Sequence, residues 1–88
     1  MAQALVMVEM DDQALGIEKI KDHLASVQLG PMGAKQIVLS VGPFGGGSVA
    51  FLRIGSNDLE GMGRAIAEFA KVPNARSVMA IKILASGN

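Results

Sequence analysis

The 88-residue chain has no cysteine, no tryptophan and no tyrosine, and only three phenylalanines. Without cysteine it can form neither a disulfide framework nor a reactive thiolate. The scarcity of aromatic rings favours packing over stacking on bases or sugars. An excess of charge is also missing, because eight basic and eight acidic residues are scattered along the chain and give a formal net charge of zero. No basic stripe is visible for neutralising phosphates, so we expect no nucleic-acid partner for this chain alone.

Long apolar runs are absent as well. The N-terminal segment is apolar for only a few residues before Glu9 and has no basic leader. We therefore expect neither a signal peptide nor a membrane span, and predict a cytoplasmic protein. The sequence is instead rich in aliphatic side chains, and 50% of its residues are hydrophobic. Its length predicts a single domain, residues 1–88, with a core of modest size.

Four β-rich runs carry apolar residues on both faces. They are Ala4–Met10, Gln36–Val41, Ser48–Gly55 and Ser77–Leu84. One alternating set in these runs is entirely hydrophobic: Val6, Val8, Met10, Ile37, Leu39, Val41, Ala50, Leu52, Ile54, Met79, Ile81 and Ile83. The opposite set is also mostly apolar and includes Leu5, Met7 and Phe51. A sheet with one solvated face alternates apolar with polar residues, so we expect a second copy of the chain to cover the second face.

Two stretches have the 3, 4, 3 spacing of an amphipathic helix. Their apolar positions are Ile17, Ile20, Leu24 and Val27 in the first, and Leu59, Met62, Ile66 and Phe69 in the second. We expect Asp11 and Asp12 to cap the first helix, and residues 30–33 to end it. Asn57, with Glu60 three residues on, predicts a variant of the capping box for the second helix.

Residues 43–47 contain three consecutive glycines and predict a hairpin loop between the second and third strands. A phosphate-binding loop would precede a helix, whereas this segment precedes a strand. Two interpretations stay open, a flexible hairpin tip or a loop that closes over a ligand or lines a pore. The complete order βαββαβ predicts an α+β, ferredoxin-like sandwich with an antiparallel sheet of order 4-1-3-2.

Two segments near the second helix resemble a known family. Residues 58–66 read Asp-Leu-Glu-Gly-Met-Gly-Arg-Ala-Ile, and residues 72–77 read Val-Pro-Asn-Ala-Arg-Ser. Both are similar to the effector-binding (RAM) domain of leucine-responsive and asparagine-type transcription regulators, here in a stand-alone form. The resemblance implies ferredoxin-like units that pair sheet to sheet into a dimeric α/β barrel. It also implies that small effectors such as amino acids bind between the subunits.

The same resemblance implies several site residues. The effector segment of the family corresponds to residues 42–45, which places Phe44 at the site, although Gly45 stands where the family has Asp. The family-like turn contains Asn74 and Arg76. The two residues either fix the turn by hydrogen bonds to the backbone or line the intersubunit site. Residues 44–49 also resemble the hairpin of bacterial microcompartment shell proteins, which would imply structural self-assembly. The turn is similar to that of small GYD-type proteins of the same barrel class.

Charged residues on the second sheet face form the strongest candidate site. In the order 4-1-3-2, Arg53 and Lys82 point from that face at one end and flank Leu5. Glu9 is expected at the opposite end with Ser40 nearby. Because buried charges need partners, two interpretations stay open. Either Arg53 or Lys82 forms an ion pair with Glu9 across a dimer, or the two cations bind a carboxylate in a small cavity.

No set of nucleophile, base and orienting residue can be named, and the sole histidine, His23, lies among charged residues of the first helix. We expect no catalysis, no metal and no cofactor. The leading prediction is a domain that binds or senses a small molecule, such as a carboxylate or amino acid, at the interface of a homodimer or a multiple of dimers. The alternatives are a shell-type structural protein and a small dimeric-barrel enzyme. Such an enzyme would act on an apolar substrate in a dry cavity lined by Met7, Val38 and Phe51.

Overall fold

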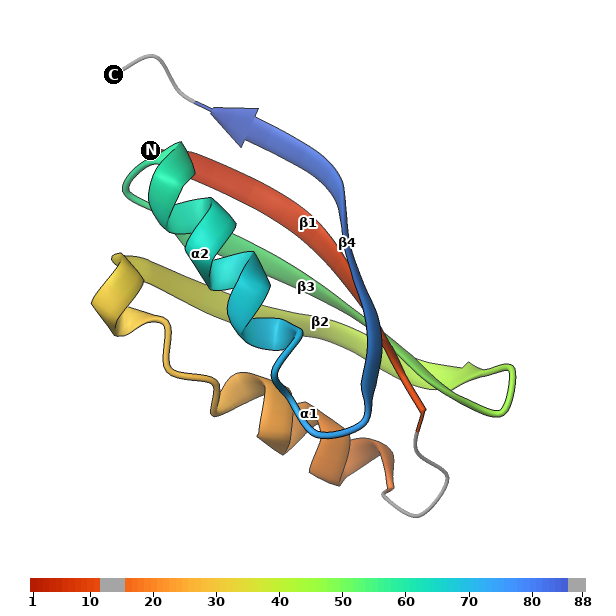
Figure 1. Cartoon of the computed structure of the whole chain (residues 1–88). Coiled ribbons are helices and arrows are strands. Elements are labelled where there is room, and N and C mark those ends of the chain that lie inside the picture. The colour runs from red at the N-terminus through yellow and green to blue at the C-terminus, as the bar shows by residue number, and fades with distance from the viewer. Residues whose placement is uncertain (12–15, 86–88) are drawn as a thin grey trace.

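The computed structural model describes residues 1–11 and 16–85 (Figure 1). Its elements are β1 (Ala2–Met10), α1 (Ile17–Ala25), the short 3-10 helix η1 (Gly30–Met32), β2 (Ala34–Phe44), β3 (Gly47–Ser56), α2 (Leu59–Phe69) and β4 (Ala75–Ala85). The predicted order βαββαβ is therefore confirmed. Each strand contains its predicted range and extends beyond it at one end or both.

The four strands form one antiparallel sheet with the order β2-β3-β1-β4. This is the predicted order 4-1-3-2 counted from the other edge, and it is consistent with a ferredoxin-like fold. Strands β1 and β3 occupy the centre, whereas β2 and β4 form the edges. Both helices lie on the same face of the sheet, so the molecule has two layers (Figure 1).

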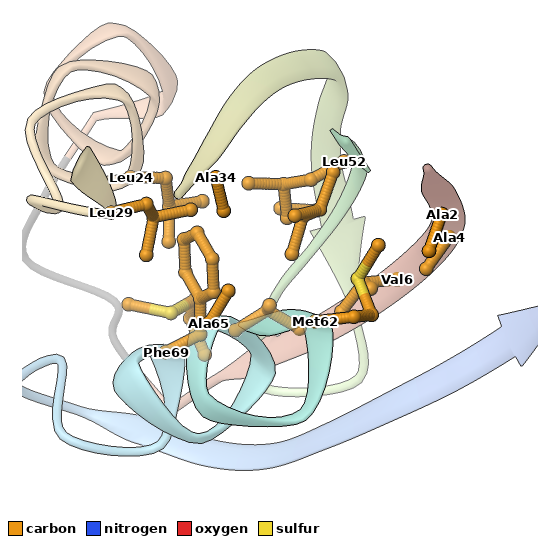
Figure 2. Packing of buried hydrophobic residues seen from close by; sticks show 14 of the residues in the cluster. Ala2, Ala4, Val6, Leu24, Leu29, Ala34, Leu52, Met62, Ala65 and Phe69 are labelled. Atoms are coloured by element: carbon orange, nitrogen blue, oxygen red, sulfur yellow. The ribbon is translucent and has the colours of Figure 1, made fainter. Parts of the chain in front are cut away.

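The hydrophobic core lies between the sheet and the helices. Strand β1 contributes its even-numbered residues and β3 contributes Ala50, Leu52 and Ile54, all of which are buried. Figure 2 shows how Leu24 of α1 and Met62, Ala65 and Phe69 of α2 meet this face. Of the predicted helical stripes, Ile20, Leu24, Met62 and Phe69 are buried, whereas the first residues of the two helices, Ile17 and Leu59, are exposed.

An irregularity in β2 changes which of its residues face the core. The register of β2 on β3 shifts between Val38 and Ser40. Before the shift, Val38 pairs with Leu52 on the helix-facing side, and Ile37 pairs with Arg53 on the other side. The sequence pattern groups Ile37 and Leu39 in one alternating set with Val6 and Val8, but they do not share the burial of those residues, because they are 54% and 49% exposed. A bulge inverts the alternation of a strand, and the sequence pattern alone does not show it.

Strand β4 shows the same effect. Val78 pairs with Val8 and packs against the core, while Met79 pairs with Met7 on the opposite face. The sequence pattern groups Met79 with Val6 and Val8, but it lies on the other face and is 53% exposed. A register shift opposite Leu5 and Val6 then changes the alternation for the rest of the strand.

Helix α1 is shorter than predicted and begins later. Gly16 is its N-cap, so Asp11, which directly follows β1, does not cap it. Asp12 lies outside the described residues. The helix ends at Ala25 rather than at residues 30–33, and the side-chain amide of Gln36 donates to the carbonyl of Leu24 at 3.0 Å. A side chain of β2 thus donates to a carbonyl group at the C-terminal end of this helix that has no partner within the helix.

Helix α2 begins one residue later than predicted. Asp58 is the N-cap, and its carboxylate accepts a hydrogen bond from the N–H of Gly61 at 2.7 Å. The prediction of Asn57 as the cap is therefore wrong. Gly61 packs closely against η1, because a Cβ added there would lie 2.5 Å from the carbonyl oxygen of Met32. The cap and this close contact hold the start of α2 over the end of the sheet.

The hairpin between β2 and β3 is tighter than predicted. Strand β2 continues to Phe44, which pairs with Gly47, so only Gly45 and Gly46 form the turn. Gly45 has a φ of 60°, a conformation that favours glycine. A Cβ on Gly47 would lie 2.0 Å from the carbonyl oxygen of Met10, so this position also needs glycine.

Candidate binding site

The sheet face opposite the helices is not covered by any described part of the chain (Figure 1). We call it the open face and define it by register, glycines aside, as Gln3, Leu5, Met7, Glu9, Lys35, Ile37, Ser40, Phe44, Val49, Phe51, Arg53, Ser77, Met79, Lys82 and Leu84. Its apolar residues are partly or largely exposed, with Leu84 at 58%. Large exposed apolar patches are rare on monomeric proteins and mark interaction surfaces.

Arg53 and Lys82 lie together at one end of the open face. Both pair with Leu5, Arg53 from β3 and Lys82 from β4. Neighbouring strands are about 4.8 Å apart, which puts the two Cα atoms about 10 Å from each other across β1. Arginine and lysine side chains are long enough to reach a common anion over Leu5. We call this region, together with Lys35 on β2, the cationic end.

Two adjoining hollows occupy the cationic end. The first has a volume of about 120 Å³ and is lined by Gln3, Ala4, Leu5, Arg53, Lys82 and Leu84. The second, of about 390 Å³, is lined by Gln3, Lys35, Gln36, Ile37, Arg53 and Gly55. They share Gln3 and Arg53, and neither lining includes a carboxylate. The combination of basic head groups and apolar walls suits an anion with an apolar body.

The charges of the open face have no counterion within the described chain. The ion pairs among residues 1–11 and 16–85 all belong to helices or their ends: Lys21 with Glu18, Arg64 with Glu60 and Lys71 with Glu68. None of them involves Arg53, Lys82 or Glu9. The cationic end is therefore a positive surface on a chain whose formal net charge is zero.

The other predicted site residues do not lie with Arg53 and Lys82. Glu9 pairs with Val49 and Ser77 and lies four residues along β1 from Leu5, a distance of about 14 Å. Phe44 at the end of β2 and Arg76 at the start of β4 belong to this same far end. The predicted set thus divides between the two ends of the sheet.

Ser40 is not the neighbour of Glu9 that was expected. It pairs with Phe51 of β3, and β3 lies between β2 and β1.

Asn74 has a φ of 69°, and its carbonyl accepts a hydrogen bond from the N–H of Asp11 at 2.8 Å. Asparagine tolerates this left-handed conformation better than most residues. The backbone of Asn74 therefore joins the start of β4 to the end of β1.

Lys35 and Gln3 are members of the site that the sequence pattern missed. Both precede the predicted strand ranges, although the alternation continues through them once the strands are extended.

A larger hollow of about 480 Å³ lies next to Lys35, between η1 and the end of β3. Its lining consists of Met1, Gly30, Gly33, Ala34, Lys35, Gly55, Ser56 and Asn57.

The cavity expected for an enzyme does not form. Val38 lies on the helix-facing side of the sheet, whereas Met7 and Phe51 lie on the open face, so the three cannot line one space. Among the described residues, no cluster of three or more histidine, cysteine or acidic side chains could hold a metal ion. No helix in the described ranges is long and apolar enough to cross a membrane.

Comparison with known proteins supports the fold alone. The chain matches no protein-family model and none of the curated proteins. Among solved structures, it is similar to the De novo designed protein Foldit4, with a TM-score of 0.62, 15% sequence identity and coverage of 97% of both chains. The resemblance to the RAM domain therefore stays a prediction.

Proposed function

We propose that this chain is a non-catalytic, self-associating domain that binds a small carboxylate between two copies. The observation that carries the proposal is the placement of Arg53 and Lys82 on either side of Leu5. They lie at one end of an exposed apolar face and have no acidic partner among the described residues. Self-association accounts for the apolar face, and a carboxylate accounts for the two cations.

The size of the open face supports self-association. Four strands about 4.8 Å apart and about 30 Å long give a footprint of roughly 600 Å². Two copies would bury roughly 1,200 Å², which is the lower end of the range for stable specific interfaces. Two sheets pack face to face when both inner faces are apolar, and Ile37, Met79 and Leu84 give the open face that character.

Covering the open face also makes an acidic partner necessary for Arg53 and Lys82. A second sheet would remove water from Arg53 and Lys82, and an unpaired charge in such a place is costly. The guanidinium of Arg53 can hold a carboxylate with two parallel hydrogen bonds, while Lys82 adds a point charge. Leu5 and Leu84 in the wall of the first hollow favour a ligand with an apolar body.

The test begins with native mass spectrometry of the freshly purified protein. We expect dimers, or multiples of dimers, that carry a small additional mass. Calorimetry with sodium benzoate and sodium hexanoate as probes then measures binding. Arg53→Gln should weaken binding of these probes at least tenfold, whereas the control Lys71→Gln, which removes a cation paired on the helix side, should not. Equal affinities for the two variants would contradict the carboxylate site.

A structural, self-assembling role is the second candidate, and strand β4 favours it. Ile81, Ile83 and Leu84 are all exposed, and β4 has one edge without a strand partner within the described chain. Such an apolar edge can pair with a strand of another copy. Assemblies that grow with protein concentration, and carry no small molecule, would favour this role over a closed dimer with a ligand.

A further inference from the structure

We infer that two copies pack with their β1 strands antiparallel, so that Glu9 of the partner subunit lies over Leu5 between Arg53 and Lys82. The inference rests on the proposed covering of the open face by a second copy. It adds the orientation of the two copies and a residue that the partner contributes to the site. The pairing is reciprocal, because in a two-fold dimer each copy provides both the cationic end and the acidic residue.

The layout of charge on the open face supports this orientation. Its cations, Lys35, Arg53 and Lys82, gather near one end of the strands. Glu9 is the acidic residue of this face and lies toward the opposite end of β1, about 14 Å from Leu5. The paired cations of the face therefore lie at one end and its carboxylate lies toward the other, where Arg76 also lies outside the paired register.

Symmetry leaves two ways to stack two aligned sheets. A two-fold axis that runs along the strands places like ends together, so that Arg53 would face the cationic end of the partner. An axis across the strands places each cationic end against the end of the partner subunit that carries Glu9. Like charges brought together at an interface disfavour association, so the layout of charge selects the axis across the strands.

The register of β1 then fixes which residues meet. On the open face of this central strand, Met7 lies midway between Leu5 and Glu9. An axis that passes near Met7 places Leu5 of one copy opposite Glu9 of the other. Leu5 is the residue that Arg53 and Lys82 flank, and all three line the hollow of about 120 Å³. A carboxylate on the partner therefore approaches the hollow between the two cations.

Glu9 of the partner subunit neutralises only one of the two charges of Arg53 and Lys82, so one positive charge remains at each end of the interface. A small carboxylate and Glu9 of the partner subunit approach the same pair, so ligand binding and association become coupled. Replacing Glu9 by Gln removes the competitor without changing the size of the side chain. We expect Glu9→Gln to bind the benzoate probe several-fold more tightly than the natural chain does.

Cysteine cross-linking tests the orientation cleanly, because the chain contains no cysteine. Facing sheets are about 10 Å apart, beyond the reach of a disulfide, whose Cα atoms lie within about 7 Å. A short bismaleimide linker is therefore the appropriate reagent. Met7→Cys should cross-link to itself, and a mixture of Leu5→Cys with Glu9→Cys should give the mixed dimer. Arg64→Cys, on the exposed side of α2, is the control that should stay monomeric after denaturation.

Charge reversal provides a second, independent test. Glu9→Lys should raise the dimer dissociation constant at least tenfold, because three cations then meet at each end. Adding Arg53→Glu to the same chain should restore association to within about threefold. Self-linking of Leu5→Cys and of Glu9→Cys, without the mixed product, would overturn the orientation while leaving self-association intact. A natural chain that stays monomeric at every concentration would instead overturn the proposed covering of the open face.

Discussion

The two faces of the sheet are both apolar, yet they differ in what covers them. Along β1, Val6 and Val8 are completely buried under the helices, whereas their neighbours Leu5 and Met7 are only partly buried. The polar content also differs, since the helix-facing side includes the buried hydroxyls of Ser48 and Ser56, and the open face carries full charges. The comparison teaches that full charges enter this apolar sheet on the face that no helix covers, whereas the helix-covered face holds only buried hydroxyls.

The strongest test of the difference between the two faces is to place the same charge on adjacent residues of β1. Val8→Asp buries a carboxylate without a partner, which costs several kcal/mol, a large part of the roughly 5–15 kcal/mol that stabilise a domain. Met7→Asp should leave the monomer folded and abolish association. Circular dichroism with urea and sedimentation separate the two outcomes. If both variants unfold alike, the faces are not distinct in the way described.

A second comparison uses the same residue type in both environments. Phe69 is completely buried beneath the sheet, whereas Phe44 is 59% exposed at the hairpin. Phe69→Ala should reduce the free energy of unfolding by about 3–5 kcal/mol. Phe44→Ala should change it by no more than about 0.5 kcal/mol. Urea denaturation of both variants measures the difference, and a large loss from Phe44→Ala would show that the hairpin is more than a connection.

The smallest expected effect concerns the cap of the helix that covers the core. Asp58→Ala removes the carboxylate that accepts from the N–H of Gly61 and should cost about 1 kcal/mol. Asn57→Ala is the matched control, since the hydrogen bond from Asn57 N–H to the carbonyl of Gly33 uses only the backbone. If thermal denaturation shows a larger loss of stability for Asn57→Ala than for Asp58→Ala, Asn57 rather than Asp58 is the N-cap.

The sequence pattern predicted the strand order, the two helices and the position of each strand, because alternation and helical spacing persist over many residues. It failed at Ile37 and Met79, because each edge strand has a register shift that no residue type marks. The start of α2 was misplaced by one residue because Asn57 and Asp58 are adjacent and both residue types cap helices. The start of α1 was missed because its N-cap, Gly16, makes no side-chain hydrogen bond that a sequence pattern would mark.

For the candidate site, Arg53 and Lys82 could be placed beside Leu5 because strand order and alternation suffice there. Ser40 was misplaced because the register shift in β2 brings it level with Met7 rather than with Glu9, and β3 lies between the two strands. Lys35 was missed because strand ends are the least marked part of a β-rich run. The identity of a ligand is not encoded in such patterns at all, since one fold serves many functions.

The central position of β1 has a consequence for how the chain folds. Strand β1 is made before its partners β3 and β4, which begin only at residues 47 and 75. The β2–β3 hairpin closes through a two-residue turn, on a timescale of about microseconds. Pairing of β1 with β4 must bridge almost the whole chain and is slower for that reason. During synthesis, β1 therefore has neither of its strand partners, and both of its apolar faces are uncovered. In this interval the nascent chain depends most on protection from aggregation.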